Sequence, residues 1–305
     1  MNARCIRILL PALTLASAWL TPVCAEIRIR HAQGELVLPQ PPKRVVALEF
    51  SFVDALVSVG MAPTGIADDR QPERIIGPLR DAVKGYASVG SRYQPSLEAI
   101  AALKPDLIIA DQRLHQAVYS ELQAIAPTLV IDVRSSTYQE DLETLPVVAR
   151  ALGKEEQMRQ RLRRHAEVMD KYARSIENDQ KLTAVFGVSS DKGSWLHTEA
   201  TYAAGVLKRL GFDTPLKRGR NRMGSVPYVK TGLEQLLAIN PDILLLGRYS
   251  QPAQIDSWAK NPLWRGLKAV QNKRVYWVDG NVWARSRGLI SAELMTAQLH
   301  GLLRQ

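Results

Sequence analysis

The chain has 305 residues, a formal net charge of +10 at pH 7 and 46% hydrophobic residues. This length is enough for a large buried core and for two lobes. Both cysteines, Cys5 and Cys24, lie within the first 25 residues, so the rest of the chain excludes a disulfide framework, a thiolate metal site and a cysteine nucleophile.

Residues 1–25 have the pattern of a secretory signal peptide. Arg4 and Arg7 precede the apolar run Ile8–Leu20, and small residues at 23–25 predict cleavage between Ala25 and Glu26. A transmembrane anchor is the alternative, but the run is shorter than the roughly 18 apolar residues that a span requires. We therefore expect an exported protein, located in the periplasm.

For an exported protein, two further questions are whether it carries a lipid anchor and what kind of ligand its charge favours. Cys24 could carry a lipid, as in bacterial lipoproteins, but Pro22 and Val23 fit that motif poorly and favour a soluble product. Removal of residues 1–25 takes away two arginines and no acids, which lowers the net charge from +10 to +8. In an exported protein this charge suits an anionic small ligand or surface better than nucleic acid, although solubility alone would also account for it.

Strands and helices alternate from residue 44 onward. The apolar run Arg44–Leu48 predicts a buried strand, and Ser51 is a suitable N-cap for a helix through Ala55–Val59. Short connections between alternating elements predict a mostly parallel sheet covered on both faces. Further strands are expected near residues 63–67, 87–90, 106–110 and 128–133, and further helices near residues 97–103, 115–125 and 138–152.

One segment of this alternation occurs twice. Ser96–Ala110 (SLEAIAALKPDLIIA) is matched 136 residues later by Gly232–Leu246 (GLEQLLAINPDILLL). Each copy combines a short amphipathic helix, a proline that ends it and an apolar run long enough for a buried strand. Two copies so far apart are too few for a solenoid and predict two similar α/β lobes.

A long helix is predicted between the lobes. Residues 154–177 contain no Gly or Pro and carry apolar residues at helical spacing, which predicts a helix of roughly 36 Å. A coiled-coil dimer segment is the alternative, but about three heptads are marginal for one, so we expect a monomer. The predicted organisation is a signal peptide at 1–25, an N-terminal lobe at 26–153, an interlobe helix at 154–178 and a C-terminal lobe at 179–305. In this last lobe we expect strands near 182–189, 194–197, 242–246 and 275–278, and helices near 203–210, 262–270 and 290–303.

Two glutamates occupy matching places in the repeat. Glu98 and Glu234 each lie in the first turn of a predicted helix, where the helix dipole alone would favour an acid by about 0.3–1 kcal/mol. Their equivalence in the two lobes suggests a pair on one face, suited to docking on basic patches of a partner.

Arginines follow predicted strands in both lobes. Arg92 lies in a turn before the first repeat helix, Arg113 follows strand 106–110, and Arg285 and Arg287 lie in a loop before the last helix. Ligand crevices of α/β sheets form at such strand ends, and guanidinium groups suit bidentate capture of carboxylates or phosphates. We expect an anion site with Trp283 as one wall, although any single arginine could be a solvated surface residue and a lone Trp commonly serves packing.

Motifs of catalysis are missing from the sequence. No GxGxxG, Walker loop, GxSxG or HExxH occurs, and the pair Asp68-Asp69 is typical of a solvated turn. No pair of histidines has metal-ligand spacing among His31, His115, His165, His197 and His300. The sequence therefore indicates no enzyme and no resident metal or cofactor.

The motifs ALEFSFVDAL, GIADD, SVGSRYQPSLEAIAALKPDLIIAD, GLEQLLAINPDILLL, NPLW and VWARSRG have close counterparts in one family. The chain resembles the periplasmic binding proteins for iron–siderophore complexes and vitamin B12 that supply ABC importers, and among them the ferric-citrate branch. The resemblance implies a class III periplasmic binding protein, with two Rossmann-like lobes of parallel sheets joined by a single long α-helix, a shallow ligand cleft and little hinge motion. It implies capture of ferric citrate, or a related ferric carboxylate siderophore, for delivery to an inner-membrane ABC permease. Iron would arrive as the chelate, without ligands from the protein.

The resemblance also assigns residues. It implies that Glu98 and Glu234 pair with arginines of the permease, and that Arg92 matches a ligand-binding arginine of the ferric-hydroxamate relative. Met223 falls where that relative has an aromatic wall, which argues against a hydroxamate. Trp283, Arg285, Arg287, His197 and Thr198 match the ferric-citrate branch, and Arg113 lies one position from an arginine of that branch. A different cargo (another siderophore, haem or cobalamin) and an exported enzyme on the same scaffold remain the alternatives.

Overall fold

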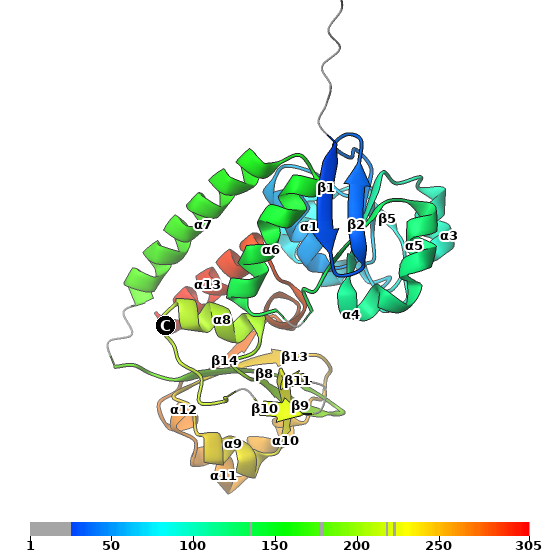
Figure 1. The fold of residues 1–305 in the computed structure, drawn as a ribbon. Coiled ribbons are helices and arrows are strands. Elements are labelled where there is room, and N and C mark those ends of the chain that lie inside the picture. The colour runs from blue at the N-terminus through cyan, green and yellow to red at the C-terminus, as the bar shows by residue number, and fades with distance from the viewer. Residues whose placement is uncertain (1–25, 135, 177–179, 218, 222–223, 305) are drawn as a thin grey trace, which may run out of the picture.

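The structure is a computed structural model that describes residues 26–304 except 135, 177–179, 218 and 222–223, with no description of side chains at 218–226. The predicted signal peptide at 1–25 and Met223 lie outside the described residues. The described chain forms two α/β lobes, with a long helix running along one side of the molecule (Figure 1). The predicted fold class is confirmed.

A five-stranded parallel sheet forms the centre of the N-terminal lobe. Its strand order is β5-β4-β3-β6-β7, and the pairing of β3 with β6 sets Val45 opposite Leu107. β3 and β6 are buried along their whole length, as expected of the middle of a parallel sheet covered on both faces. The strands are β3 (Val45–Ala47), β4 (Gly65–Ile66), β5 (Ala87–Ser88), β6 (Leu107–Asp111) and β7 (Thr128–Ile131).

Helices cover both faces of this sheet. α1 begins after the N-cap Glu49, whose carboxylate accepts from the backbone N–H of Phe50, so the expected N-cap Ser51 instead lies inside the first turn. The helices are α1 (Phe50–Ser58), α2 (Gly77–Ala82), α3 (Leu97–Ala102), α4 (Gln112–His115), α5 (Tyr119–Ile125) and α6 (Tyr138–Ala151), with short 3₁₀ turns at Pro72–Arg74 and Gln116–Val118.

A β-hairpin precedes the sheet, although no strand was predicted before residue 44. β1 (Ile27–His31) and β2 (Gly34–Leu38) pair antiparallel around a turn in which Gly34 has a φ of +136°. Ile29, Leu36 and Leu38 are buried in the core, and the residues next to them in β1 and β2 are more exposed, the period-two pattern of a half-buried strand.

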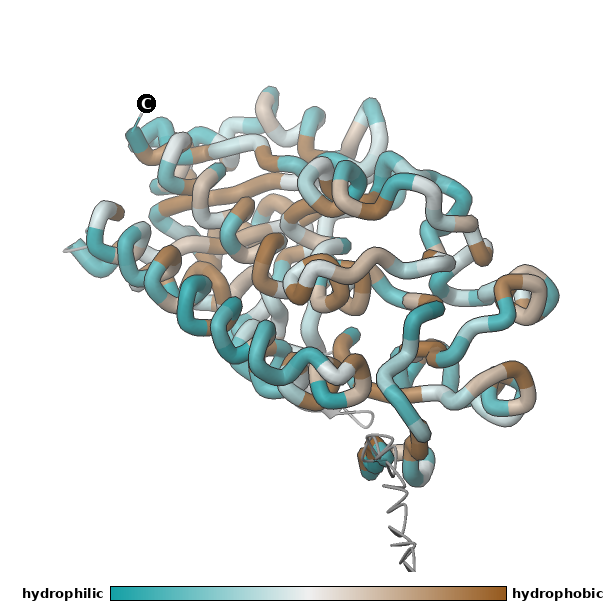
Figure 2. Tube along the Cα trace, turned by 90° about the horizontal axis from the view of Figure 1, so that it is seen from above, coloured by the Kyte–Doolittle hydropathy of each residue, from teal (hydrophilic) through white to brown (hydrophobic). Residues whose placement is uncertain are grey.

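α7 (Glu155–Ile176) is the long interlobe helix. Its 22 residues extend about 33 Å at 1.5 Å per residue. Its exposed turns are mostly hydrophilic in the hydropathy-coloured tube (Figure 2), whereas Met158, His165 and Met169 are buried. Among the helices that the structure describes, none combines the length and the hydropathy that a membrane span requires.

The C-terminal lobe has a mixed five-stranded sheet of order β12-β9-β8-β13-β14. β8, β13 and β14 run parallel, but β8 turns directly into β9. β9 therefore runs opposite to the other strands and pairs antiparallel with both β8 and β12, unlike the predicted parallel arrangement. The strands are β8 (Ala184–Ser190), β9 (Gly193–His197), β12 (Tyr228–Thr231), β13 (Ile243–Arg248) and β14 (Val275–Val278), with a separate hairpin of β10 (Gly219–Asn221) and β11 (Gly224–Val226).

Helices of this lobe follow the expected order, except that the single helix predicted near 262–270 is two short ones separated at Gly266. A turn of π-helix, η3 (Asn281–Arg285), precedes the last helix. The second repeat copy, α9 and β13, occupies the same place beside β8 and β14 as α3 and β6 do beside β3 and β7. The helices are α8 (Tyr202–Arg209), α9 (Leu233–Ile239), α10 (Ile255–Trp258), α11 (Pro262–Arg265), α12 (Lys268–Gln271) and α13 (Leu289–Leu303).

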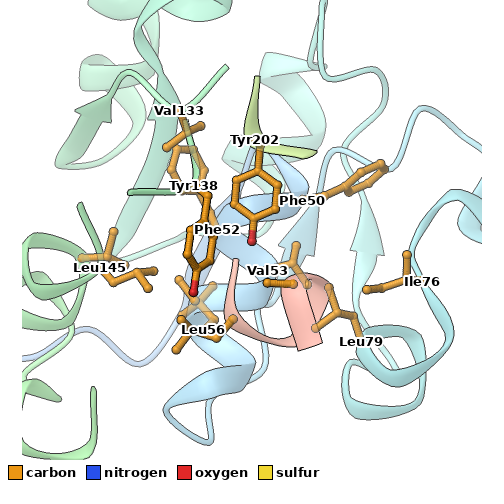
Figure 3. Packing of buried hydrophobic residues seen from close by; sticks show 14 of the residues in the cluster. Phe50, Phe52, Val53, Leu56, Ile76, Leu79, Val133, Tyr138, Leu145 and Tyr202 are labelled. Atoms are coloured by element: carbon orange, nitrogen blue, oxygen red, sulfur yellow. The ribbon is translucent and has the colours of Figure 1, made fainter. Parts of the chain in front are cut away.

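The largest hydrophobic cluster is shared by both lobes. It joins α1 and α6 of the first lobe to α7, α8, α13 and the strand β8. Figure 3 shows Tyr202 of α8 beside Phe50, Phe52 and Val53 of α1 and beside Tyr138 of α6. A continuous close-packed core of this kind stabilises one relative position of the lobes.

Candidate functional site

A cavity of about 310 Å³ lies between the two lobes and is lined by residues of both. Most of these residues follow the carboxyl ends of strands, where open α/β sheets form their ligand crevices. The charged residues of the lining are Glu49, Arg92 and Arg134 from the first lobe and Arg285 and Arg287 from the second. Four arginines and one glutamate give the lining a net charge of +3, which suits a polyanion.

Arg92 is the most enclosed of the four arginines, with 4% of its surface exposed. Its Nε and Nη2 donate to Asp69 Oδ2 at 3.0 and 2.9 Å, and its Nη1 donates to Glu49 Oε2 at 3.1 Å. Its Cζ lies 4.3 Å from the centre of the Phe50 ring. Burial alone would lower the pKa of Arg92, but the charge of Glu49 and the hydrogen bond to Asp69 outweigh it and raise this pKa. Two carboxylates therefore already compensate the charge of Arg92.

Asp68 and Asp69 do not form the solvated turn that their sequence suggested. Asp68 is 1% exposed and accepts from the hydroxyl of Tyr86 at 2.9 Å. Asp69 pairs with Arg92 and with Arg74, the latter at 2.8 Å. This loop is thus part of the framework that holds Arg92.

Arg134 and Glu49 were not identified from the sequence. Arg134 follows β7, and its Nη1 donates to Glu49 Oε1 at 3.2 Å, so Glu49 bridges Arg92 and Arg134. The Arg134 guanidinium also lies 4.7 Å from the ring centre of Tyr93, which is 54% exposed. About a third of the Arg134 side chain is exposed, which leaves it accessible to a ligand.

Arg285 has no carboxylate partner among the described residues. Its Nη1 donates to Asn281 Oδ1 at 2.7 Å, and its guanidinium lies 3.9 Å from the ring centre of Tyr249. Burial lowers the pKa of Arg285, and the nearby charges of Arg74 and Arg92 act in the same direction. Burial and repulsion between these arginines make the charged form of Arg285 less favourable, and a bound anion would offset this cost.

Arg287 reaches from the C-terminal segment to the first lobe. Its Nη1 donates to the backbone carbonyls of Val133 and Ser136, the latter at 3.3 Å. These neutral acceptors orient the guanidinium at the cavity without cancelling its charge. Arg285 and Arg287 therefore carry the charge available for an anion on this side.

His197, at the end of β9, lines the cavity and is 4% exposed. The centre of its ring lies 4.5 Å from the ring centre of Phe186 and 4.8 Å from that of Tyr228. Burial, together with the charge of Arg287, lowers the pKa of His197 to about 3, so the ring is neutral at physiological pH. Thr198 is fully buried next to it.

Two further candidate residues lie outside the lining. Trp283 is 1% exposed, donates its indole N–H to Gln298 at 2.8 Å and packs against Phe186, so it supports the cavity from behind. Arg113 has an exposed side chain that pairs with Asp132 at 3.2 Å and does not reach the cavity.

Glu98 and Glu234 lie at the starts of α3 and α9, and both are exposed. Neither forms an ion pair with another described residue. Within the described residues no group of three or more His, Cys, Asp or Glu could hold a metal ion.

Comparison with known proteins places these features in a family context. A family model described as "Periplasmic binding protein" matches residues 45–282. The Fe(3+) dicitrate-binding periplasmic protein FecB of Escherichia coli is 42% identical over 88% of this chain and 87% of its own length. The Fe(3+)-citrate-binding protein YfmC of Bacillus subtilis is 38% identical over 87% of this chain and 82% of its own.

Solved structures share the fold at lower identity. Staphylococcus aureus SirA complexed with staphyloferrin B has a TM-score of 0.77 and 24% identity, and covers 91% of this chain and 98% of its own. The siderophore-binding protein BauB, bound to two acinetobactin molecules and ferric iron, has a TM-score of 0.74 and 23% identity, and covers 92% of this chain and 99% of its own.

Proposed function

Since the chain belongs to the periplasmic binding protein family, whose members are solute-binding proteins, we propose that it captures ferric citrate, or a related ferric carboxylate siderophore, and delivers it to an inner-membrane ABC permease for iron uptake. The observation that carries the proposal is the interlobe cavity with four arginines, of which Arg285 and Arg287 have no carboxylate partner among the described residues. The names and identities of FecB and YfmC support citrate as the organic component.

The chemistry of the cavity fits a preformed anionic chelate. Guanidinium groups bind carboxylates through paired N–H donors, and a net charge of +3 in a partly enclosed cavity attracts a polyanion. Citrate would occupy the coordination sites of the iron, so the protein would contribute charge and shape complementarity, with no resident cofactor and no catalytic step. A monomer in the periplasm, exported through the predicted signal peptide, completes the proposal.

Titration of the purified mature protein tests the cargo. We expect ferric citrate to bind and to bind roughly tenfold more weakly when salt rises from about 10 mM to about 150 mM, because the Debye length falls from about 30 Å to about 8 Å. Isothermal titration calorimetry measures this, with iron-free citrate, a ferric hydroxamate and haem as parallel ligands. If only haem or only the hydroxamate bound, that ligand would be the cargo instead of ferric citrate. If none of the four ligands bound, the result would contradict the proposed function.

The two exposed glutamates are proposed to dock on the permease. The double variant Glu98→Gln/Glu234→Gln should bind ferric citrate within about twofold of wild type, yet reduce cellular uptake of labelled iron at least about tenfold, because it removes charge pairing with the partner. The matched control is Glu155→Gln/Glu156→Gln, which removes two exposed acids from the first turn of α7. Wild-type uptake in the Glu98/Glu234 variant would rule out the docking role.

A further inference from the structure

In each lobe, an arginine that follows the outermost strand of the sheet lines the cavity and contacts a tyrosine. Arg134 follows β7, which pairs in parallel with β6, and Arg285 follows β14, which pairs in parallel with β13. β6 and β13 are the strands of the internal repeat, so the two arginines arise from equivalent loops. Both side chains line the same cavity, one from each lobe.

Each of these arginines lies against a tyrosine of its own lobe. The Arg134 guanidinium is 4.7 Å from the ring centre of Tyr93, and the Arg285 guanidinium is 3.9 Å from the ring centre of Tyr249. Both tyrosines also line the cavity. The Tyr93 hydroxyl also accepts a hydrogen bond from Nη2 of Arg134, so this pair is joined by a hydrogen bond as well as by the ring contact. In the second pair, the Tyr249 ring lies against one face of the Arg285 guanidinium and leaves the N–H groups, which lie in the guanidinium plane, for other partners.

A second contact fixes the orientation in each pair. Arg134 donates to Glu49 at 3.2 Å, and Arg285 donates to Asn281 at 2.7 Å. The position of the Tyr249 ring depends in turn on Gly280, because a Cβ added there would come within 2.9 Å of the ring. The backbone thus leaves room for this tyrosine beside its arginine.

We infer that Arg134–Tyr93 and Arg285–Tyr249 form a two-sided clamp that selects metal chelates with carboxylates at two opposite ends, one end for each lobe. The inference rests on the proposed function and narrows its substrate class, since a complex of iron with two citrates presents outer carboxylates on both sides. Tyr93 and Tyr249 act as positioning residues that orient the arginines and supply no charge. A single small carboxylate would engage one pair only.

Leucine variants test the clamp by removing a ring and keeping both arginines. With ferric citrate prepared in large excess citrate, Tyr93→Leu and Tyr249→Leu should each weaken binding about five- to tenfold, the range expected for loss of one cation–π contact and its orienting effect. Tyr93→Leu also removes the hydrogen bond from Arg134 to the Tyr93 hydroxyl. Because the pairs lie in different lobes, the double variant should multiply the two effects, giving about 25- to 100-fold. Tyr249→Phe, which keeps the ring, should bind within about twofold of wild type.

Gly280→Ala provides a backbone-level variant of the same test. Gly280 has a φ of −63°, which alanine adopts readily, but the added methyl group would displace the Tyr249 ring. We expect affinity to fall as in Tyr249→Leu while the thermal midpoint stays within a few degrees of wild type. A purely structural role for Tyr249 would instead lower the midpoint in step with affinity and would not be rescued by phenylalanine.

Titration of the same variants with iron-free citrate separates a two-sided from a one-sided site. The clamp predicts that iron-free citrate loses affinity in only one of the two leucine variants. Three results would overturn the clamp. Both leucine variants could bind ferric citrate with wild-type affinity, or Tyr249→Phe could lose as much affinity as Tyr249→Leu. The double variant could also bind no more weakly than the single variants. Absence of ferric citrate binding by the wild-type protein would instead overturn the proposed function together with it.

Discussion

Replacing both Arg285 and Arg287 by alanine should weaken ferric citrate binding by about 100- to 10,000-fold. A hydrogen bond to a charged group contributes about 1.5–3 kcal/mol, and about 1.4 kcal/mol corresponds to a factor of ten in affinity. These two arginines should have the largest effect because neither has a carboxylate partner among the described residues. Arg92, by contrast, is already paired with Glu49 and Asp69.

Titration calorimetry at low salt measures the loss, and circular dichroism checks that the variant is folded. The control Arg159→Ala/Arg163→Ala removes the same charge from α7, outside the cavity, and should bind within about twofold of wild type if net charge alone is not decisive. Arg285→Lys keeps the charge and loses the planar fork, so its affinity should fall between wild type and alanine. An Arg285/Arg287 variant that binds like wild type would place the anion elsewhere.

The sequence predicts the scaffold well because the scaffold depends on local patterns. The repeat around Glu98 and Glu234 correctly identifies equivalent helices and strands, and the fold class is confirmed by the structure. Differences arise where an element depends on distant contacts. The hairpin of β1 and β2 was not predicted, and β1 lies against α6 and β7, which are far along the chain. Ile29 lies between two arginines, but Leu36–Leu38 is a continuous apolar run, so the alternation of a half-buried strand is present only before Gly34.

The site is less predictable because it depends on which side of the backbone each residue faces. Arg285 and Arg287 line the cavity, but Trp283, two residues before Arg285, is buried behind it because the segment 281–285 forms a π-helical turn. The contribution of Arg134 requires Glu49, which is 85 residues away in sequence. No local motif records such a pair, and only the folded structure brings it together.

Gly288→Ala should be strongly destabilising, because Gly288 joins the arginine loop to the last helix. Its φ of +113° and ψ of −175° belong to a region that is essentially restricted to glycine, and an added Cβ would lie 2.4 Å from Cγ of Asp54. Asp54 is fully buried and accepts hydrogen bonds from the backbone N–H groups of Ile290 and Ser291 at 3.1 and 2.9 Å, which caps α13.

We therefore expect Gly288→Ala to lower the free energy of unfolding by about 2–5 kcal/mol, combining about 1–2 kcal/mol of backbone strain with about 1–3 kcal/mol of overpacking. The hydroxyl of Tyr202 bonds both the carbonyl and the N–H of Gly288, at 2.6 and 3.1 Å, so displacement of the loop should also move Arg287 and weaken ligand binding. Urea unfolding of the ligand-free protein measures the first effect and titration the second.

The matched control for this prediction is Gly301→Ala in the same helix. Gly301 lies within α13, its added Cβ would meet no atom within 4 Å, and alanine is favoured over glycine inside a helix by about 1 kcal/mol. Its stability should therefore equal or exceed that of the wild type, with unchanged ligand affinity. If Gly288→Ala were as stable as Gly301→Ala, the buried contact between α1 and the start of α13 would not be what holds the lobes and the arginine loop in place.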